Sequence, residues 1–244
     1  CRSFVKVMLL IASAASLLLA PSYLTKAGVA KSEYPVLITL STLGMMVMVS
    51  ANDIMTLYMG LELQNLPLYV LAAMKRDDKR SSEAGIKYFA LSAFASCLFL
   101  FGLSLIYGFA LSTNFDVISS ALTQGTANIA GVAVGLCFVL VGLAFKVSAA
   151  PFHMWAPDVY EGAPTSVTAF FATAPKIAAL SVLAILLIGP FAKLSALWQM
   201  PLVIISVLSM ITGSLGGLLQ DNLKRLMAYS AIANTGTILV GLAV

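Results

Sequence analysis

Apolar runs about 20 residues long dominate the sequence, and an α-helix of this length crosses the hydrocarbon core of a membrane. The polar segments between the runs are short, so no soluble domain fits between them. Only 10% of the residues are charged, whereas about 25% are charged in a soluble domain. We therefore predict an all-α fold, a polytopic transmembrane helical bundle that forms one domain over residues 1–244. The predicted spans are 4–20, 35–52, 54–74, 84–111, 128–156, 164–190, 195–219 and 226–244.

The same composition excludes other classes of protein. With 60% apolar residues, the chain is neither a soluble enzyme nor a disordered protein. The sequence lacks the ten-residue alternation of a membrane β-barrel. The three cysteines and one histidine have no spacing typical of a metal site, and the basic residues form no stripe that would indicate nucleic-acid binding. The sequence runs from Cys1 to an apolar end at Val244, so we expect a fragment of a longer polypeptide.

The lysine and arginine residues divide unevenly between the two sides of the predicted bundle. Cytoplasmic loops carry an excess of these residues, so we predict that the loop Lys75–Arg80 is cytoplasmic. With alternating spans, one side holds Lys26, Lys31, Lys75, Arg76, Lys79, Arg80, Lys224 and Arg225, and the other holds Arg2, Lys6 and Lys193.

One carboxylate, Glu62, falls near the middle of a predicted span. An ionisable group at that depth costs at least about 2.5–3.5 kcal/mol, so by default it marks a functional pathway. Gly60 and Pro67 flank Glu62, and Gln64 and Asn65 follow it, which indicates that this helix faces protein or water and not only lipid. The alternative explanation for Glu62 is a hydrogen bond between helices with no role in transport.

A helix break is predicted near Pro151, and Lys146 lies just before it. The apolar segment here has about 30 residues, or about 45 Å of helix, which exceeds the hydrocarbon core of about 30 Å. Pro151 has no N–H to donate to the carbonyl four residues earlier, which favours a break. Broken helices at membrane depth line polar cavities in transporters. The alternative for Lys146 is a side chain that extends to the membrane surface.

Two more lysines fall within predicted spans. Lys176 lies 12 residues into the span 164–190, where neither membrane surface is within easy reach. Lys87 lies near the start of the span 84–111, so a side chain that extends to the surface explains it equally well.

Three further residues are accessory candidates. His153 is suited to proton relay, but packing beside its aromatic neighbours is the more common role of a single histidine. Asp158 and Glu161 lie in the short segment before the next span, where helix capping and access to the cytoplasm both fit.

One buried acid and several buried lysines permit proton transfer. Burial lowers the pKa of a lysine, and a nearby carboxylate raises it. A lysine therefore releases its proton when the carboxylate moves away and binds a proton when the carboxylate returns. A pKa change of two units corresponds to about 2.7 kcal/mol, which matches the roughly 2.3 kcal/mol needed to move one charge against 100 mV. The sequence therefore predicts a gated proton relay.

Five stretches, in order along the chain, carry a resemblance to a known family. They surround the residues discussed above and cover nearly the whole sequence. In them the chain resembles the antiporter-like membrane subunits of respiratory complex I, the proton-translocating NADH–quinone oxidoreductase, and most closely their subunit N branch. The stretches are Glu33–Asp53, Leu57–Tyr69, Arg80–Phe89, Gly142–Pro164 and Asn222–Ile232.

The resemblance implies a role for each buried charge. Glu62 would be the essential acid, and Lys146 on the broken helix would be its partner. Lys176 would be the central relay lysine, and Lys87 an accessory residue of the polar path.

The resemblance also implies an organisation and a setting. The family has two inverted five-helix repeats, so residues 35–190 would form the first, and residues 195–244 would begin the second. The far lysine of the family would lie beyond the last residue of this sequence. FMN, iron–sulfur clusters, NADH and quinone would belong to other subunits, and no cofactor is expected in this chain. Its partners would be the other membrane-arm subunits and the lipid bilayer of a bacterial inner membrane.

Two other functions remain open at this stage. A cation/proton antiporter subunit, or the matching subunit of a membrane-bound hydrogenase, shares the same helix bundle. A bound sodium ion would favour additional carboxylates at mid-depth, whereas Glu62 is the only acid found there. A scaffold subunit whose buried charges only hold helices together is the second alternative.

Overall fold

The computed structural model describes residues 2–26, 28 and 32–243, and most of them are helical. Lys31, which contributes to the predicted charge asymmetry, lies outside this part of the chain. The helices are α1 (Arg2–Lys26), α2 (Glu33–Ser50), α3 (Ile54–Ala72), α4 (Lys79–Ala110), α5 (Phe115–Gln124), α6 (Ile129–Val147), α7 (Trp155–Gly162), α8 (Thr165–Ile188), the 3₁₀ turn η1 (Ala192–Leu194), α9 (Ser195–Leu218) and α10 (Leu223–Ala243).

Within these residues, seven helical segments are long and apolar enough to cross a membrane, so the chain is a multi-pass membrane protein. They match seven of the eight predicted spans. The remaining predicted span, 54–74, forms the 19-residue helix α3. This helix carries Glu62, Gln64 and Asn65, whose polarity explains why it is not among the seven.

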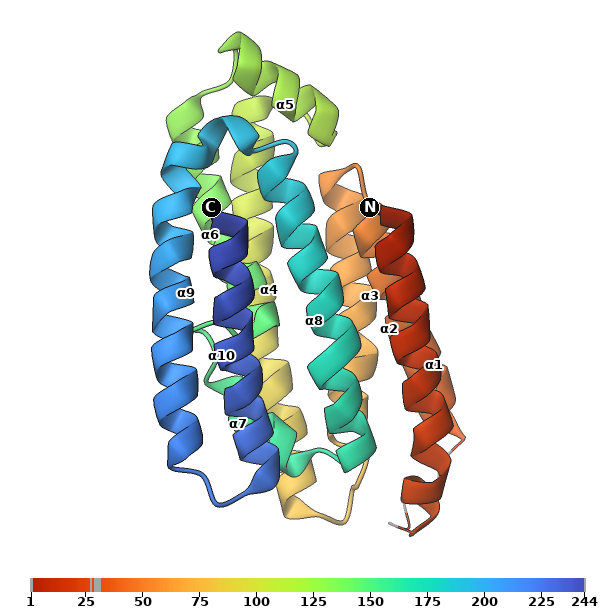
Figure 1. The fold of residues 1–244 in the computed structure, drawn as a ribbon. Coiled ribbons are helices and arrows are strands. Elements are labelled where there is room, and N and C mark those ends of the chain that lie inside the picture. The colour runs from red at the N-terminus through yellow and green to blue at the C-terminus, as the bar shows by residue number, and fades with distance from the viewer. Residues whose placement is uncertain (1, 27, 29–31, 244) are drawn as a thin grey trace.

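The long helices run side by side in an elongated bundle (Figure 1). Helices α9 and α10 run side by side at one edge, and α1 lies at the opposite edge. Helix α8 lies between them and packs against α1, α2 and α6. The short helix α5 covers one end of the bundle, and α7 lies in the other half.

Close helix packing depends on paired glycines. A Cβ atom on Gly102 of α4 would lie 2.6 Å from the carbonyl oxygen of Gly135 on α6. A Cβ atom on Gly60 of α3 would lie 2.6 Å from the backbone nitrogen of Met48 on α2. Small residues at such positions let helix backbones approach closely, which is a main source of packing energy between helices in lipid.

The predicted helix break is confirmed, but its boundaries differ from the predicted span 128–156. Helix α6 ends at Val147, and Ser148 has a left-handed backbone with φ 61°. A turn that contains Pro151 follows, and the chain re-enters a helix at Trp155. Helix α7, together with α5, was not predicted, because the prediction rested on apolar runs long enough to span a membrane, and these helices have only 8 and 10 residues.

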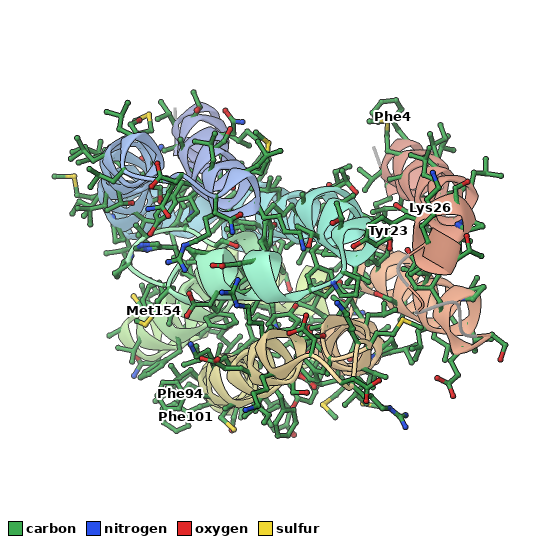
Figure 2. The ribbon with its side chains drawn as sticks, turned by 90° about the horizontal axis from the view of Figure 1, so that it is seen from below. Phe4, Tyr23, Lys26, Phe94, Phe101 and Met154 are labelled. Carbon is green, nitrogen blue, oxygen red and sulfur yellow. The ribbon has the colours of Figure 1, made fainter. Side chains whose placement is uncertain are left out.

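The outer face of the bundle is apolar. Figure 2 shows the bundle from below, with Phe4, Phe94 and Phe101 pointing outward from its rim. These side chains are 69%, 66% and 52% exposed, respectively. Large exposed apolar groups are unfavourable in water and favourable in lipid, as expected of membrane-spanning helices.

Replacing Gly102 with alanine is expected to lower the free energy of unfolding by about 1–3 kcal/mol, because the added methyl group meets the backbone of α6. Gly108, on the same helix, is the matched control, since a Cβ atom added there would have no other atom within 4 Å. Gly108→Ala is expected to be neutral or slightly stabilising. Thermal unfolding of the full-length protein in detergent tests the pair, and equal stability of the two variants would contradict the packing argument.

Candidate functional site

The buried ammonium group of Lys146 is the centre of the candidate site. Lys146 is the penultimate residue of α6, and its side chain is only 8% exposed. Its Nζ donates a hydrogen bond to Asn65 Oδ1 of α3 at 3.0 Å and another to Ser92 Oγ of α4. Three helices therefore meet at one charge, and Lys146 does not extend to the membrane surface as the alternative explanation required.

Glu62 is connected to Lys146 through Asn65. The Asn65 side-chain nitrogen Nδ2 donates to Glu62 Oε1 at 3.3 Å, while its Oδ1 accepts from Lys146. Asn65 follows Glu62 by three residues, so both side chains lie on the same face of α3. Among the described residues, no Glu62–Lys146 ion pair forms within 4.0 Å. The amide therefore separates the acid from the lysine and holds both.

Tyr69 completes the network on the other side of Lys146. Its hydroxyl donates to Ser92 Oγ at 2.8 Å, so Ser92 accepts from both Tyr69 and Lys146. Asn65 and Ser92 are fully buried, and Tyr69 is 9% exposed. The sequence pattern marked Asn65 only as a polar residue, and it gave no sign of Ser92 or Tyr69, because isolated serines and tyrosines are common in membrane helices.

Lys176 occupies a separate environment. It follows Pro175 inside α8 and is 7% exposed, and its Nζ has no hydrogen-bond partner among the described residues. The Nζ atom lies 5.7 Å from the centre of the Tyr160 ring, within range of a cation–π interaction. The burial predicted for Lys176 is therefore observed.

An aromatic cluster joins the surroundings of the two buried lysines. Trp155 stacks on Phe145 with ring centres 5.6 Å apart, and the Phe145 ring lies 5.6 Å from Lys146 Nζ. Trp155 also contacts Tyr160, beside Lys176, edge to face at 6.4 Å. The indole N–H of Trp155 donates to the carbonyl of Phe145 at 2.9 Å, which fixes α7 against the end of α6.

Lys87 lies away from the Lys146 network, in a cluster of charges at one end of the bundle. Its Nζ is 2.7 Å from Glu83 Oε1 and 2.9 Å from Asp158 Oδ2. The Lys87 side chain is 42% exposed, so it is not a deeply buried charge. Its contact with Asp158 nevertheless joins α4 to α7.

The same cluster holds the predicted residues Asp158 and Glu161. Arg225 of α10 binds both, at 3.2 Å and 3.0 Å, and Arg80 of α4 lies 3.4 Å from Glu161. The residues surround a cavity of about 290 Å³. Positive and negative side chains alternate around it, and they fix the orientation of α7 relative to α4 and α10.

Pro151 and His153 lie in the turn between α6 and α7. Pro151 is exposed, whereas the Nδ1 atom of His153 is buried without a hydrogen-bond partner among the described residues. In the described part of the chain, no three His, Cys, Asp or Glu side chains are grouped to hold a metal ion. The carboxylate of Glu62 and the amine of Lys146 are side chains of the kind that bind and release protons.

Ser92→Ala is expected to lower the free energy of unfolding by about 1–3 kcal/mol, because it removes a buried acceptor from both Lys146 and Tyr69. Ser96, one turn further along α4, is the matched control, since its buried hydroxyl has no partner among the described residues. Ser96→Ala is expected to change stability by less than about 0.5 kcal/mol. Thermal unfolding of the full-length protein compares the two; a larger loss in the Ser96 variant would count against the network.

Comparison with known proteins identifies a family. The family model described as "NADH:quinone oxidoreductase/Mrp antiporter, TM" matches residues 51–244, which include every candidate residue of the site.

Relatives and solved structures agree with this match. The NADH-quinone oxidoreductase subunit N of Maricaulis maris is 57% identical over 98% of this chain and 50% of the relative. A chain of respiratory complex I from Thermus thermophilus is 32% identical with a TM-score of 0.80, and the match covers 99% of this chain and 50% of that one. A chain of the Mrp complex from Dietzia sp. DQ12-45-1b is 25% identical with a TM-score of 0.85, over 98% and 45%. The chain thus spans about half the length of the curated relatives it matches.

Proposed function

We propose a function on the basis that this chain belongs to the NADH:quinone oxidoreductase/Mrp antiporter family of transmembrane proteins. The chain is part of a proton-translocating membrane-arm subunit of an NADH–quinone oxidoreductase. The names of its relatives, NADH-quinone oxidoreductase subunit N, support this assignment. Electron transfer from NADH to quinone would occur in other subunits, which would hold the FMN and iron–sulfur clusters. The subunit would contribute proton translocation.

The observation that carries the proposal is the chain of hydrogen bonds from Glu62 through Asn65 to the buried Lys146. A buried ammonium group is costly, and here it is held by two side chains that come from different helices. A group that only joined helices would not need to be ionisable, because a neutral side chain avoids that cost.

In the proposed relay, Lys146 holds a proton at Nζ while Asn65 and Ser92 accept its hydrogen bonds. Glu62 is the acid whose approach or withdrawal changes the proton affinity of Lys146. Because Asn65 separates the two charges, direct pairing requires its amide to move. Lys176 is the next proton carrier, on the far side of the Trp155–Tyr160 contact.

The charged cluster at the end of the bundle suits proton exchange with one aqueous side. Lys87, Asp158 and Glu161 surround its cavity, so we assign them accessory roles in access. His153 lies in the turn between this region and Lys146, and we assign it an accessory role in proton relay, because its Nδ1 atom has no hydrogen-bond partner among the described residues.

A cation/proton antiporter subunit is the second candidate function, because the chain also resembles a chain of an Mrp complex. The matches to subunit N proteins, at 50–57% identity, favour the NADH–quinone oxidoreductase. Sodium transport would differ from proton transport in one respect that is simple to measure: turnover would depend on the sodium concentration.

Glu62→Gln and Lys146→Ala, introduced separately into the full-length gene in its native membrane, test the relay. Proton uptake per assembled complex is expected to fall at least about tenfold, which corresponds to about 1.4 kcal/mol in an activation barrier. The measurements are the amount of assembled complex, NADH-driven quinone reduction and proton uptake, with and without sodium.

Lys193→Ala is the control, because Lys193 lies outside the network and binds the carbonyl of Thr123 at the opposite end of the bundle. It should leave pumping unchanged. Full pumping per complex in both test variants, with only the yield reduced, would show that the charges hold helices together and do not carry protons.

We also infer that the chain lies in a bacterial inner membrane, with the loop Lys75–Arg80 on the cytoplasmic side. Asp77, in this loop, and Thr126, at the other end of the bundle, are both exposed. In a cysteine-free background, Asp77→Cys is expected to resist a membrane-impermeant thiol reagent in spheroplasts, while Thr126→Cys reacts. The reverse labelling pattern would invert the assignment.

A further inference from the structure

The break after α6 leaves several backbone groups without their helical partners, among them the Val147 carbonyl and the Ala150 N–H. In a continuous helix the carbonyl of Val147 would accept from the N–H of residue 151, but residue 151 is proline and has none. The N–H of Ala150 would donate to the carbonyl of Lys146, but the chain has left the helix by then. Val147 and Ala150 are no more than 1% exposed, so an unpaired group in either would be costly.

Two side-chain hydroxyls from neighbouring helices lie within hydrogen-bond distance of the Ala150 N–H and the Val147 carbonyl. The N–H of Ala150 donates to Ser209 Oγ of α9 at 2.8 Å, and the Ser209 hydroxyl in turn donates to the carbonyl of Ile205. The Thr235 hydroxyl of α10 lies 3.2 Å from the Val147 carbonyl oxygen. Ser209 and Thr235 are themselves buried, at 0% and 2% exposure.

The two hydroxyls differ in whether their hydrogen bonds to the backbone at the break compete with other hydrogen bonds. Ser209 accepts from one partner and donates to another, so its two hydrogen bonds are compatible. Thr235 has one hydroxyl hydrogen, which is within reach of both Val147 and the carbonyl of Ala231 on its own helix, at 2.8 Å. Ser209 is therefore the firmer of the two attachments.

Helices α9 and α10 are locked together beside these hydroxyls. Ser206 Oγ donates to the carbonyl of Gly236 at 2.7 Å. A Cβ atom on Gly213 would lie 2.5 Å from the backbone nitrogen of Ala233, so the two helix backbones touch at this point. Ser209 lies between Ser206 and Gly213 along α9, and Thr235 adjoins Gly236. The pair thus presents both hydroxyls from one rigid surface.

We propose that Ser209 and Thr235 are positioning residues for Lys146, through which α9 and α10 set the place of the helix break. Lys146 directly precedes Val147, so a shift of the break moves the Lys146 ammonium group relative to Asn65 and Ser92. The inference rests on the proposed function, in which Lys146 carries the proton. In this proposal, helices α9 and α10, which are predicted to begin the second repeat, hold the broken helix of the first repeat in position.

Hydrogen exchange tests the attachment itself, independently of pumping. In the purified complex with the full-length subunit, Ser209→Ala and Thr235→Val are expected to speed amide exchange in the segment 148–154 at least about tenfold. Thr212→Val on α9 and Thr237→Val on α10 are the matched controls, because each hydroxyl bonds only within its own helix. Unchanged exchange in both test variants would overturn the proposal.

The number of protons translocated per quinone reduced tests positioning. This ratio, measured per assembled complex, is expected to fall at least about fivefold in Ser209→Ala, to fall less in Thr235→Val, and to recover in Thr235→Ser. A residue with a purely structural role would lower the yield of complex and leave the ratio unchanged. If Ser209→Ala does not assemble, Thr235→Val and its recovery in Thr235→Ser carry the test.

Comparison with Lys146→Ala separates the two proposals. Loss of pumping in Lys146→Ala, with a normal ratio in Ser209→Ala and Thr235→Val, would overturn the positioning role alone. Normal pumping in Lys146→Ala would overturn the proposed relay, and the positioning role with it, even where hydrogen exchange confirms the attachment.

Discussion

The structure depends on keeping one ammonium group, that of Lys146, away from both lipid and water. An isolated charge at that depth is unstable, so the surrounding helices must supply hydrogen-bond acceptors. Helix α3 supplies Asn65 and helix α4 supplies Ser92. The close approach of α4 to α6, where Gly102 meets Gly135, brings Ser92 within reach of Lys146. The packing of these three helices therefore determines which hydrogen-bond acceptors surround the Lys146 ammonium group.

The broken helix sets a second requirement of the same kind. Its free backbone groups are as polar as a side chain, and in the membrane they need protein partners. Helices α9 and α10 provide them through Ser209 and Thr235. The lysine thus receives its acceptors from one side of the bundle, and the backbone next to it receives its partners from the other. We therefore expect a change in either half of the bundle to alter the position or the hydrogen bonds of Lys146.

Charge is arranged differently at the end of the bundle. Lys87, Asp158 and Arg225 are partly exposed and form ion pairs, which in water contribute little to stability. Their effect is to hold the short helix α7, which lies between the helix break and the aqueous side. The bundle therefore combines a buried interior, where each charge is costly, with a partly exposed end where charged side chains pair with one another.

The sequence by itself determined the membrane setting, the positions of the long helices, the break near Pro151 and the burial of Lys146 and Lys176. These follow from apolar run length, from the missing N–H of proline and from the cost of charge in lipid, all of which are local properties. Only the tertiary structure decided that Asn65 separates Glu62 from Lys146, that Lys87 pairs with Asp158 at the end of the bundle, and that Ser209 and Thr235 hold the break. In each of these contacts except Glu62–Asn65, the partners come from segments that are distant along the chain. Sequence periodicity gives the face of a helix but not its neighbour, because the neighbour is chosen by close packing between segments that are distant along the chain.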